Sequence, residues 1–288
     1  MMEFRNYKKN DYDALIDFLV QLSNEEMNHI NWNWARFEWM IEHPDTDKLF
    51  LEKIGLWWEK GNIVGAAIYD MYLGEAFCGT LKTHMDILPE ILDYAYRVFK
   101  DENGLGIAIR NEDLKAIEKA IDLGFEKVNQ TENVMMLGLD NIIPSRIPAD
   151  IVIREYNPAE NPREFAWLLW QGFDHGNDQA EFESKDSQKQ QLRKHLDKRL
   201  SLSAVDSSGN IVGYVCLWHS PETDYAYVEP VCTIPEFRNM GISKALLTEA
   251  FSRANKLGAK KAIVISDMDF YKKLGFVNLA LFSFYWKL

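Results

Sequence analysis

Three short segments of this chain recur in its second half, in the same order and at nearly the same distance. The copies are separated by 149, 148 and 151 residues, and the matched pairs are residues 4–7 with 153–156, 61–65 with 209–213, and 123–125 with 274–276. One such match can arise by chance, but three at one spacing indicate an internal duplication. The sequence therefore predicts two related domains, residues 1–146 and 147–288, joined through a segment that contains Pro144 and Pro148.

Each copy shows the same order of helical and strand patterns, which indicates an α/β protein of the α+β kind. In the first copy we expect helices at 12–22, 34–41 and 87–99, and strands at 55–59, 63–70 and 75–85. In the second copy we expect helices at 165–170, 190–200 and 242–257, and strands at 151–153, 202–206, 211–218, 225–234 and 282–286. A Gly-Asn pair, at 61–62 and again at 209–210, suits a tight hairpin turn in each copy.

Charge and composition exclude several classes of protein. Residues 1–150 hold 15 Lys/Arg and 27 Asp/Glu, whereas residues 151–288 hold 17 of each, and an acidic chain does not suit a nucleic-acid partner. The acidic first half either attracts a cationic substrate or forms a solvated surface, and the sequence leaves both open. The first residues form no apolar leader and no window approaches 18 apolar residues, so we expect a cytoplasmic protein without a membrane partner. The histidines and cysteines show no metal-ligand spacing, and we expect no metal.

The most informative stretch for function is residues 227–251. Its first part is a strand pattern interrupted by Pro230 and Pro235, so we expect a bulge at one proline and the strand's end at the other. Its second part has apolar residues at helical spacing from Gly241 onward. The small residues between strand and helix allow a ligand to approach the backbone, and unpaired N–H groups at the helix start suit a phosphate.

This stretch and a later one resemble a known family. Arg238-x-x-Gly241-x-Ser243 resembles the acetyl-CoA-binding motif of GCN5-related N-acetyltransferases, whose usual pattern is Arg/Gln-x-x-Gly-x-Gly/Ala. Ser243 is a mild departure from that pattern. Residues 270–276 resemble the family's closing Tyr-x-x-x-Gly-Phe signature. The resemblance implies a twisted, mostly antiparallel sheet, splayed in the middle, with helices on both faces.

The first copy lacks both signatures, so the chain resembles a tandem member of the family with a degenerate N-terminal half. Residues 83–89 contain no Arg-x-x-Gly-x-small loop, and Ala120 stands in the place of Tyr271. We therefore expect acetyl transfer in the C-terminal half alone. Whether the N-terminal half binds a ligand stays open.

The resemblance implies which residues hold acetyl-CoA as the co-substrate. Backbone N–H groups from Arg238 to Lys244 would hold the diphosphate, with positive charge from these two side chains. Backbone groups of the strand would pair with the pantetheine arm as an added strand. The expected cofactor-binding residues are Val231, Cys232, Thr233, Arg238, Asn239, Met240, Gly241, Ile242, Ser243 and Lys244.

Acetyl transfer to an amine also needs a base and an acid. An amine of pKa ~10.4 is neutral only about one time in 2500 at pH 7, so its proton must be taken up, and Glu229 is the candidate base, directly or through water. A surface or salt-bridged role for Glu229 is the alternative. Tyr271 is the candidate acid, because a phenol stays protonated at pH 7 and can donate to a thiolate. His175 is a second candidate base, and His175 and Tyr227 are candidate substrate contacts.

Three functions fit these patterns. The favoured one is an N-acetyltransferase that moves an acetyl group from acetyl-CoA to an amine of a small molecule or peptide. The alternative is a non-catalytic acyl-CoA-binding or regulatory module, for which Tyr271 would be unnecessary. An aminoacyl transferase that uses aminoacyl-tRNA is disfavoured by the acidic composition.

Overall fold

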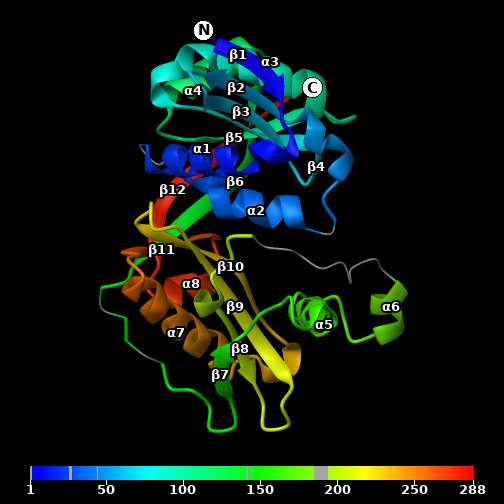
Figure 1. Ribbon diagram of the computed structural model, residues 1–288, viewed down its shortest axis with the longest axis vertical. Helices are drawn as coiled ribbons and strands as arrows, with labels where there is room; N and C mark the ends of the chain where they lie inside the picture. Colours follow the sequence, from blue (N-terminus) through cyan, green and yellow to red (C-terminus); the bar gives the residue numbers. More distant parts are fainter. Residues whose placement is uncertain (1, 26–27, 44, 141, 144, 185–193) are drawn as a thin grey trace. The chain divides into compact units, whose positions relative to one another are not determined.

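The computed structural model describes residues 2–25, 28–43, 45–140, 142–143, 145–184 and 194–288. The chain forms two compact units (Figure 1). Unit 1 comprises Met1–Met135, Ile265–Asp267 and Asn278–Leu288, and unit 2 comprises Met136–Val264 and Met268–Val277.

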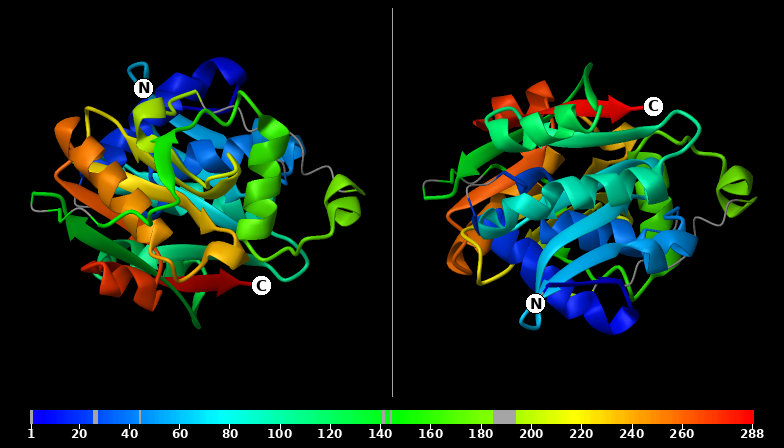
Figure 2. Two further views of the ribbon diagram at one scale, coloured as in Figure 1. Left: turned by 90° about the horizontal axis from the view of Figure 1, so that it is seen from below. Right: turned by 90° about the horizontal axis from the view of Figure 1, so that it is seen from above.

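Unit 1 is built on a mostly antiparallel sheet. In order across the sheet, its strands are β1 (Met2–Asn6), β2 (Gly55–Glu59), β3 (Asn62–Asp70), β4 (Tyr72–Thr80), β5 (Leu105–Arg110) and β12 (Val277–Lys287), with β4 and β5 parallel. The α-helices are α1 (Tyr12–Asn24), α2 (Trp34–Glu42), α3 (Leu88–Phe99) and α4 (Leu114–Asp122). Figure 1 shows α1 and α2 on one side of the sheet and α3 and α4 on the other, and the view from above in Figure 2 shows α3 lying across the strands.

Unit 2 repeats this plan. Its strands lie in the order β7 (Val152–Glu155), β8 (Ser201–Val205), β9 (Ile211–His219), β10 (Tyr225–Thr233) and β11 (Lys261–Ile265), and β10 and β11 pair in parallel. Helix α7 (Ile242–Lys256) packs on one face of the sheet and α5 (Pro162–Gly172) on the other (Figure 1). The short helices are α6 (Gln179–Ser184) and α8 (Asp269–Lys273). The sheets with helices on both faces confirm the predicted fold class.

The last strand of the chain completes the sheet of unit 1. Strand β12 pairs antiparallel with β5, with Phe282 opposite Arg110 and Tyr285 opposite Ile107. Strand β6 (Glu126–Gly138) belongs to unit 1 up to Met135 and to unit 2 from Met136 onward. The compact units therefore take residues from both sides of position 146. The boundary between the two duplicated copies, predicted at residues 146 and 147, therefore stays a prediction.

Several local predictions need correction. The helix expected at 190–200 is absent from its described part, where Asp197 accepts a hydrogen bond from the Arg199 N–H and starts a 3-10 helix, Lys198–Leu200; residues 190–193 lie outside the described residues. The strand expected to reach residue 85 ends at Thr80, where the hydroxyl donates to the Val64 carbonyl (2.7 Å) and a 3-10 helix, Lys82–Ile87, soon follows.

The hairpin turns also differ from the expected Gly-Asn pairs. In unit 1 the turn residues are Lys60 and Gly61, both with positive φ (52° and 85°), and Asn62 already begins β3. This is the backbone that a two-residue hairpin needs. In unit 2 a longer turn is closed by Asp206, whose carboxylate accepts the N–H groups of Ser208 and Asn210.

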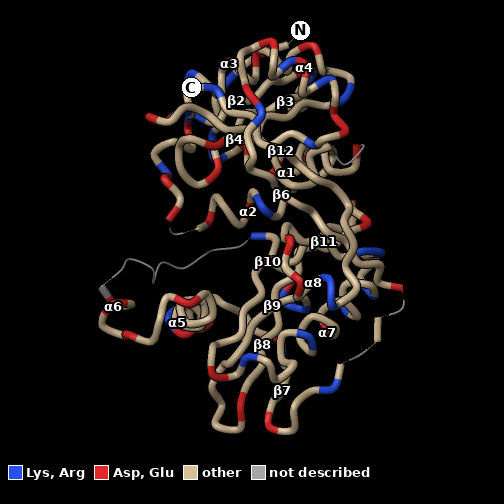
Figure 3. Tube along the Cα trace, turned by 180° about the vertical axis from the view of Figure 1, so that it is seen from behind, with Lys and Arg blue, Asp and Glu red and all other residues tan. Residues whose placement is uncertain are grey.

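Charged residues are spread over many elements of unit 1 rather than gathered on one of them (Figure 3). This distribution is typical of a solvated acidic surface. An exception is a group of partly buried carboxylates, those of Asp70, Glu75 and Glu132. Within the described ranges, no helix combines the length and apolar character that crossing a bilayer requires.

Candidate functional site

The two parallel strands of unit 2 separate in the middle of the sheet. The pairing of β10 with β11 covers Tyr225 to Tyr227, with Tyr227 opposite Ile263, whereas β10 continues to Thr233 paired with β9. The β9–β10 register shifts between Val228 and Val231, around Pro230, and β10 ends before Pro235, so both proline predictions are confirmed. Beyond Tyr227, one edge of β10 has no strand partner in the described part of the sheet. An extended ligand can pair with that edge.

The loop after β10 leads into a helix whose first N–H groups are uncapped. Asn239 and Gly241 have positive φ values of 63° and 84°, and α7 begins at Ile242 without a side-chain cap. The first N–H groups of any α-helix have no partner within the helix, and they lie at the positive end of its dipole. The start of α7 can therefore hold an anion such as a phosphate.

Ser243, the departure from the family pattern, fits this turn. Its hydroxyl lies 2.7 Å from the Thr233 hydroxyl, which joins the second residue of α7 to the end of β10. The backbone of β9 comes close at the same place, since a Cβ added at Gly213 would lie 3.2 Å from the Ile242 side chain. The serine therefore fixes the helix start against the strand end without blocking the loop.

Arg238 makes three contacts within unit 2, and its expected role beside the diphosphate stays a prediction. Its Nε donates to the Thr233 carbonyl (3.1 Å), its Nη2 donates to the Gly172 carbonyl (2.9 Å), and its Nη1 lies 2.8 Å from an oxygen of Asp174. These contacts occupy the guanidinium and pair its charge with a carboxylate. Arg238 thus connects the loop before α7 to the loop after α5, while Lys244 is exposed on the first turn of α7.

The loop after α5 lies beside the end of β10. A Cβ at Gly172 would come within 2.7 Å of the Cys232 Cβ, so this contact requires glycine. Asn177 donates to the Glu236 carboxylate (3.2 Å) and adds a second connection. His175 is exposed on this loop, with its ring 4.8 Å from that of Trp170. The sequence analysis missed Gly172 and Asp174, although Asp174 and Gly176, both at positive φ, mark a turn there.

Tyr271 is buried on α8, with 7% of its surface exposed. Its ring packs edge-on against Phe270 and Phe276, at 5.1 and 5.4 Å between ring centroids. Burial raises the pKa of the phenol above its ordinary value of 10, and the charge of Glu229 raises it further. The phenol is therefore protonated at neutral pH, and Glu229 is close enough to influence it.

Glu229 is half-buried on β10, beside the point where β10 and β11 separate. Its carbonyl accepts a hydrogen bond from the Trp218 indole (2.7 Å), which fixes the backbone at the register shift. Tyr227 is only 3% exposed, within the core of unit 2. Burial also raises the pKa of the Cys232 thiol to about 12, so this cysteine is a neutral packing residue.

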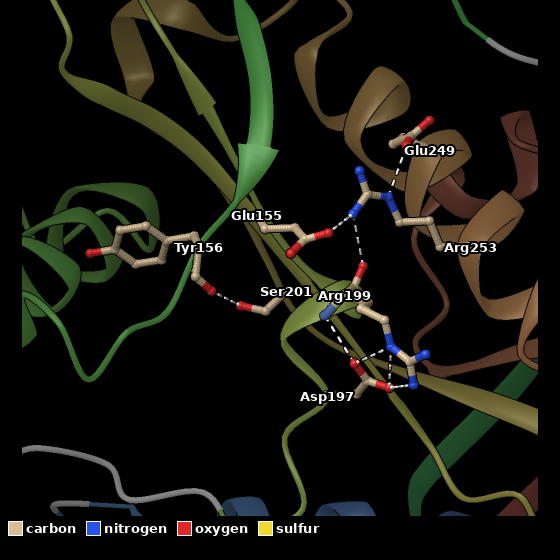
Figure 4. A network of polar contacts seen from close by, with 7 residues as sticks. All are labelled: Glu155, Tyr156, Asp197, Arg199, Ser201, Glu249 and Arg253. Carbon is tan, nitrogen blue, oxygen red and sulfur yellow. Dashed lines mark hydrogen bonds and ion pairs between the residues drawn. The ribbon is translucent and has the colours of Figure 1, made fainter.

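Polar contacts hold α7 against the first strands of unit 2 (Figure 4). Arg253 lies 2.7 Å from Glu155 on β7 and 2.8 Å from Glu249 one turn earlier on α7, and it donates to the Arg199 carbonyl. Nearby, the Ser201 hydroxyl donates to the Tyr156 carbonyl (2.6 Å). The contacts of Arg253 connect α7 to β7 and to Arg199, and the Ser201 contact joins β8 to the residue after β7.

The equivalent part of unit 1 is built differently. Thr80 lies opposite Gly65 as Thr233 lies opposite Gly213, and with this register Phe77 takes the place of Glu229 and Pro230. A 3-10 helix, Lys82–Ile87, precedes α3 where unit 2 has its glycine loop, and Ala120 is completely buried. The residues expected to carry chemistry thus all lie in unit 2, and Glu229, the glycine loop and Tyr271 have no counterparts at these positions of unit 1.

This arrangement defines a class of fold. A sheet splayed at the parallel pair of β10 with β11, followed by an uncapped helix start, is the GNAT fold, and solved GNAT structures overlay nearly the whole chain. Residues 163–276 match the family described as "Acetyltransferase (GNAT) family".

Three proteins show the extent of the similarity. A tandem GNAT protein from the clavulanic acid biosynthesis pathway shares 15% identity with a TM-score of 0.62, over 99% of this chain and 98% of its own. A GCN5-related N-acetyltransferase from Sphaerobacter thermophilus shares 18% identity with a TM-score of 0.59, over 99% and 95%. The mycothiol acetyltransferase of Arthrobacter sp. (strain FB24) is 25% identical over 176 residues, which cover 57% of this chain and 54% of that protein. The chain thus spans about half the length of this curated relative.

Proposed function

We propose that unit 2 is an acetyl-CoA-dependent N-acetyltransferase acting on an amine of a small molecule or peptide. The observation that carries the proposal is the unpaired edge of β10 leading into the uncapped start of α7. The family of residues 163–276 supports acetyl transfer as the reaction class. The relative from Arthrobacter, an acetyltransferase by name, supports the same class.

The residues present suit acetyl-CoA. Backbone N–H groups between Asn239 and Lys244 would hold the diphosphate, and the edge of β10 from Val231 to Thr233 would pair with the pantetheine arm. Arg238 would act on binding indirectly, by fixing the loop, because its guanidinium is already bonded to Asp174 and two carbonyls. The co-substrate supplies the thioester that the amine attacks.

Two side chains would move the protons of the reaction. Glu229, directly or through a water molecule, would accept the proton that the attacking amine loses. Tyr271, protonated because its pKa is raised, would donate a proton to the thiolate that leaves. His175 is the alternative base, on a loop that Arg238 joins to the binding site.

A charge placed at the helix start tests the proposal. Ser243→Asp puts a carboxylate beside the proposed diphosphate position, and we expect acetyl-CoA affinity measured by calorimetry to fall by roughly a hundredfold, since several charge-assisted hydrogen bonds are opposed. Ser252→Asp, on the same helix but two turns further along, is the matched control and should bind normally. Absence of acetyl-CoA binding by the unmodified protein, or equal binding by both variants, would refute the proposed site.

A turnover assay distinguishes the transferase from the non-catalytic acyl-CoA-binding module, the two functions that the sequence left open. Release of free thiol from acetyl-CoA with any member of an amine panel supports the transferase. Tight acetyl-CoA binding without thiol release across the panel favours the non-catalytic acyl-CoA-binding module.

A further inference from the structure

Unit 1 contains a pocket on the α2 side of its sheet, at the place where β4 and β5 separate. In the parallel pairing of these strands Glu75 lies opposite Gly106, and Glu75 also lines the pocket. It holds about 310 Å³ of free space, part of it open to solvent. Because this figure includes open solvent, it sets only an upper limit on the size of an occupant.

Negative charge exceeds positive charge in the wall of this pocket. Three carboxylates line it, from Asp70, Glu75 and Glu132, together with one guanidinium, from Arg36. Arg36 bonds to Asp70 (2.9 Å) and to Glu132 (2.8 Å), and it donates to the Asn31 carbonyl. The Arg36 guanidinium thus forms ion pairs with two of the three carboxylates.

Glu75 is the carboxylate outside this ion-pair network. It is half-buried, and its recorded hydrogen bond comes from the neutral amide of Gln130 (3.2 Å). Burial raises its pKa, and the charges of Asp70 and Glu132 raise it further, against the opposite effects of Gln130 and Arg36. Burial likewise raises the pKa of Asp70, although Arg36 lies beside it. The pocket would gain stability from a second positive charge.

The pocket lining also contains aromatic side chains and a hydrogen-bond donor without a partner. Trp32 and Phe77 stack with nearly parallel rings, 5.7 Å between centroids and 10° between planes, and Phe284 also lines the pocket. Trp32 is 3% exposed, and its indole N–H has no hydrogen-bond partner in the described part of the chain. A buried donor without a partner is costly, and an acceptor on a ligand would satisfy it.

We propose that this pocket binds a small ligand that carries a primary ammonium group and, close to it, a hydrogen-bond acceptor such as a hydroxyl or carbonyl. The ammonium bonds to Glu75, because the Arg36 guanidinium is paired with Asp70 and Glu132 and already lies 4.8 Å from the centre of the Trp32 ring. The acceptor bonds to the Trp32 N–H. A metal ion is a poorer occupant, since no metal-binding group of three or more side chains occurs among the described residues. The proposal concerns unit 1 and does not depend on acetyl transfer by unit 2.

Binding of ethanolamine, glycinamide and 1,4-diaminobutane to the full chain, measured by equilibrium dialysis with acetate as the anionic control, tests the proposal. We expect saturable binding that is tightest for the two amines that carry an acceptor. Glu75→Gln should weaken it about tenfold or more, since it removes the charge and keeps the shape. Trp32→Phe should weaken it by a smaller factor. Glu126→Gln, an exposed glutamate on the same strand as Glu132, is the matched control and should bind as the unmodified protein does.

Three outcomes would overturn the proposal: no saturable binding of any amine, equal binding by Glu75→Gln and the unmodified protein, or preference for acetate. Thermal unfolding of Glu75→Gln checks that the variant is folded, and removing a crowded carboxylate should not lower its melting temperature. The Ser243→Asp variant should still bind the amines, so a failure of the acetyl-CoA site and a failure of this pocket are separable.

Discussion

At the residue scale, Tyr271 is the side chain on which the proposed chemistry depends most. Its phenol is buried among phenylalanines, and its pKa is raised above the ordinary value. Tyr271→Phe keeps the packing and removes the proton donor, so we expect kcat to fall roughly a hundredfold or more, the usual contribution of a general acid. Acetyl-CoA affinity should be unchanged in calorimetry. Tyr72→Phe, which removes an exposed phenol from unit 1, should leave both quantities unchanged.

The raised pKa of Tyr271 also predicts a change in stability with pH. In the unfolded chain the phenol ionises near pH 10, whereas in the folded protein it stays neutral to a higher pH. Its contribution to stability is therefore complete below about pH 10, and it falls by roughly 1.4 kcal/mol per pH unit above that value. Between pH 9 and 11, the free energy of unfolding measured with denaturant should fall less for Tyr271→Phe than for Tyr72→Phe. An equal fall in the free energy of unfolding for both variants would contradict a buried phenol that stays neutral in the folded protein.

At the scale of elements, the position of the loop before α7 depends on the loop after α5. Arg238 makes this connection through Asp174 and the Gly172 carbonyl. If Arg238 fixes the loop, Asp174→Asn should raise KM for acetyl-CoA about two- to fivefold, as loss of an exposed ion pair predicts. If Arg238 instead contacts the phosphate, the same substitution should free the guanidinium and lower KM.

A double-mutant cycle sharpens this test. The effects of Arg238→Ala and Asp174→Asn should be less than additive when the two side chains act as one connection. Asp178→Asn, further along the same loop, is the control and should leave KM unchanged.

At the scale of the whole molecule, the C-terminal strand determines whether unit 1 is stable. Strand β12 covers the edge of β5 and buries Phe282, whose loss alone typically costs about 3–5 kcal/mol. In a chain that ends at Phe276, the amides of β5 should therefore lose their protection from hydrogen exchange, and unit 1 should unfold. This is expected although the deleted residues directly follow residues 163–276, the part of the chain that matches the family. Addition of a peptide of residues 277–288 should restore part of this protection. Unchanged protection of β5 would contradict the assigned role of β12.

The sequence by itself determined the features that rest on local patterns. Pro230 and Pro235 predicted the register shift and the end of β10, the apolar spacing after Gly241 predicted α7, and the repeated segments predicted two units with one plan. Each of these depends on backbone restrictions or on periodicity within a few residues. Tyr271 and the expected binding residues of the loop before α7 were predicted in the same way, from two short motifs, and their roles stay predictions.

Only the tertiary structure decided which distant segments meet. The alternation of residues 282–286 predicts a strand but not that its partner is β5, and the turn of residues 171–177 gives no sign that Asp174 would bond to Arg238. The carboxylates around Arg36 come from strands β3, β4 and β6, so no spacing in the sequence reveals their pocket. Strand pairing and charge clustering depend on contacts between residues far apart in the chain, which a one-dimensional pattern does not specify.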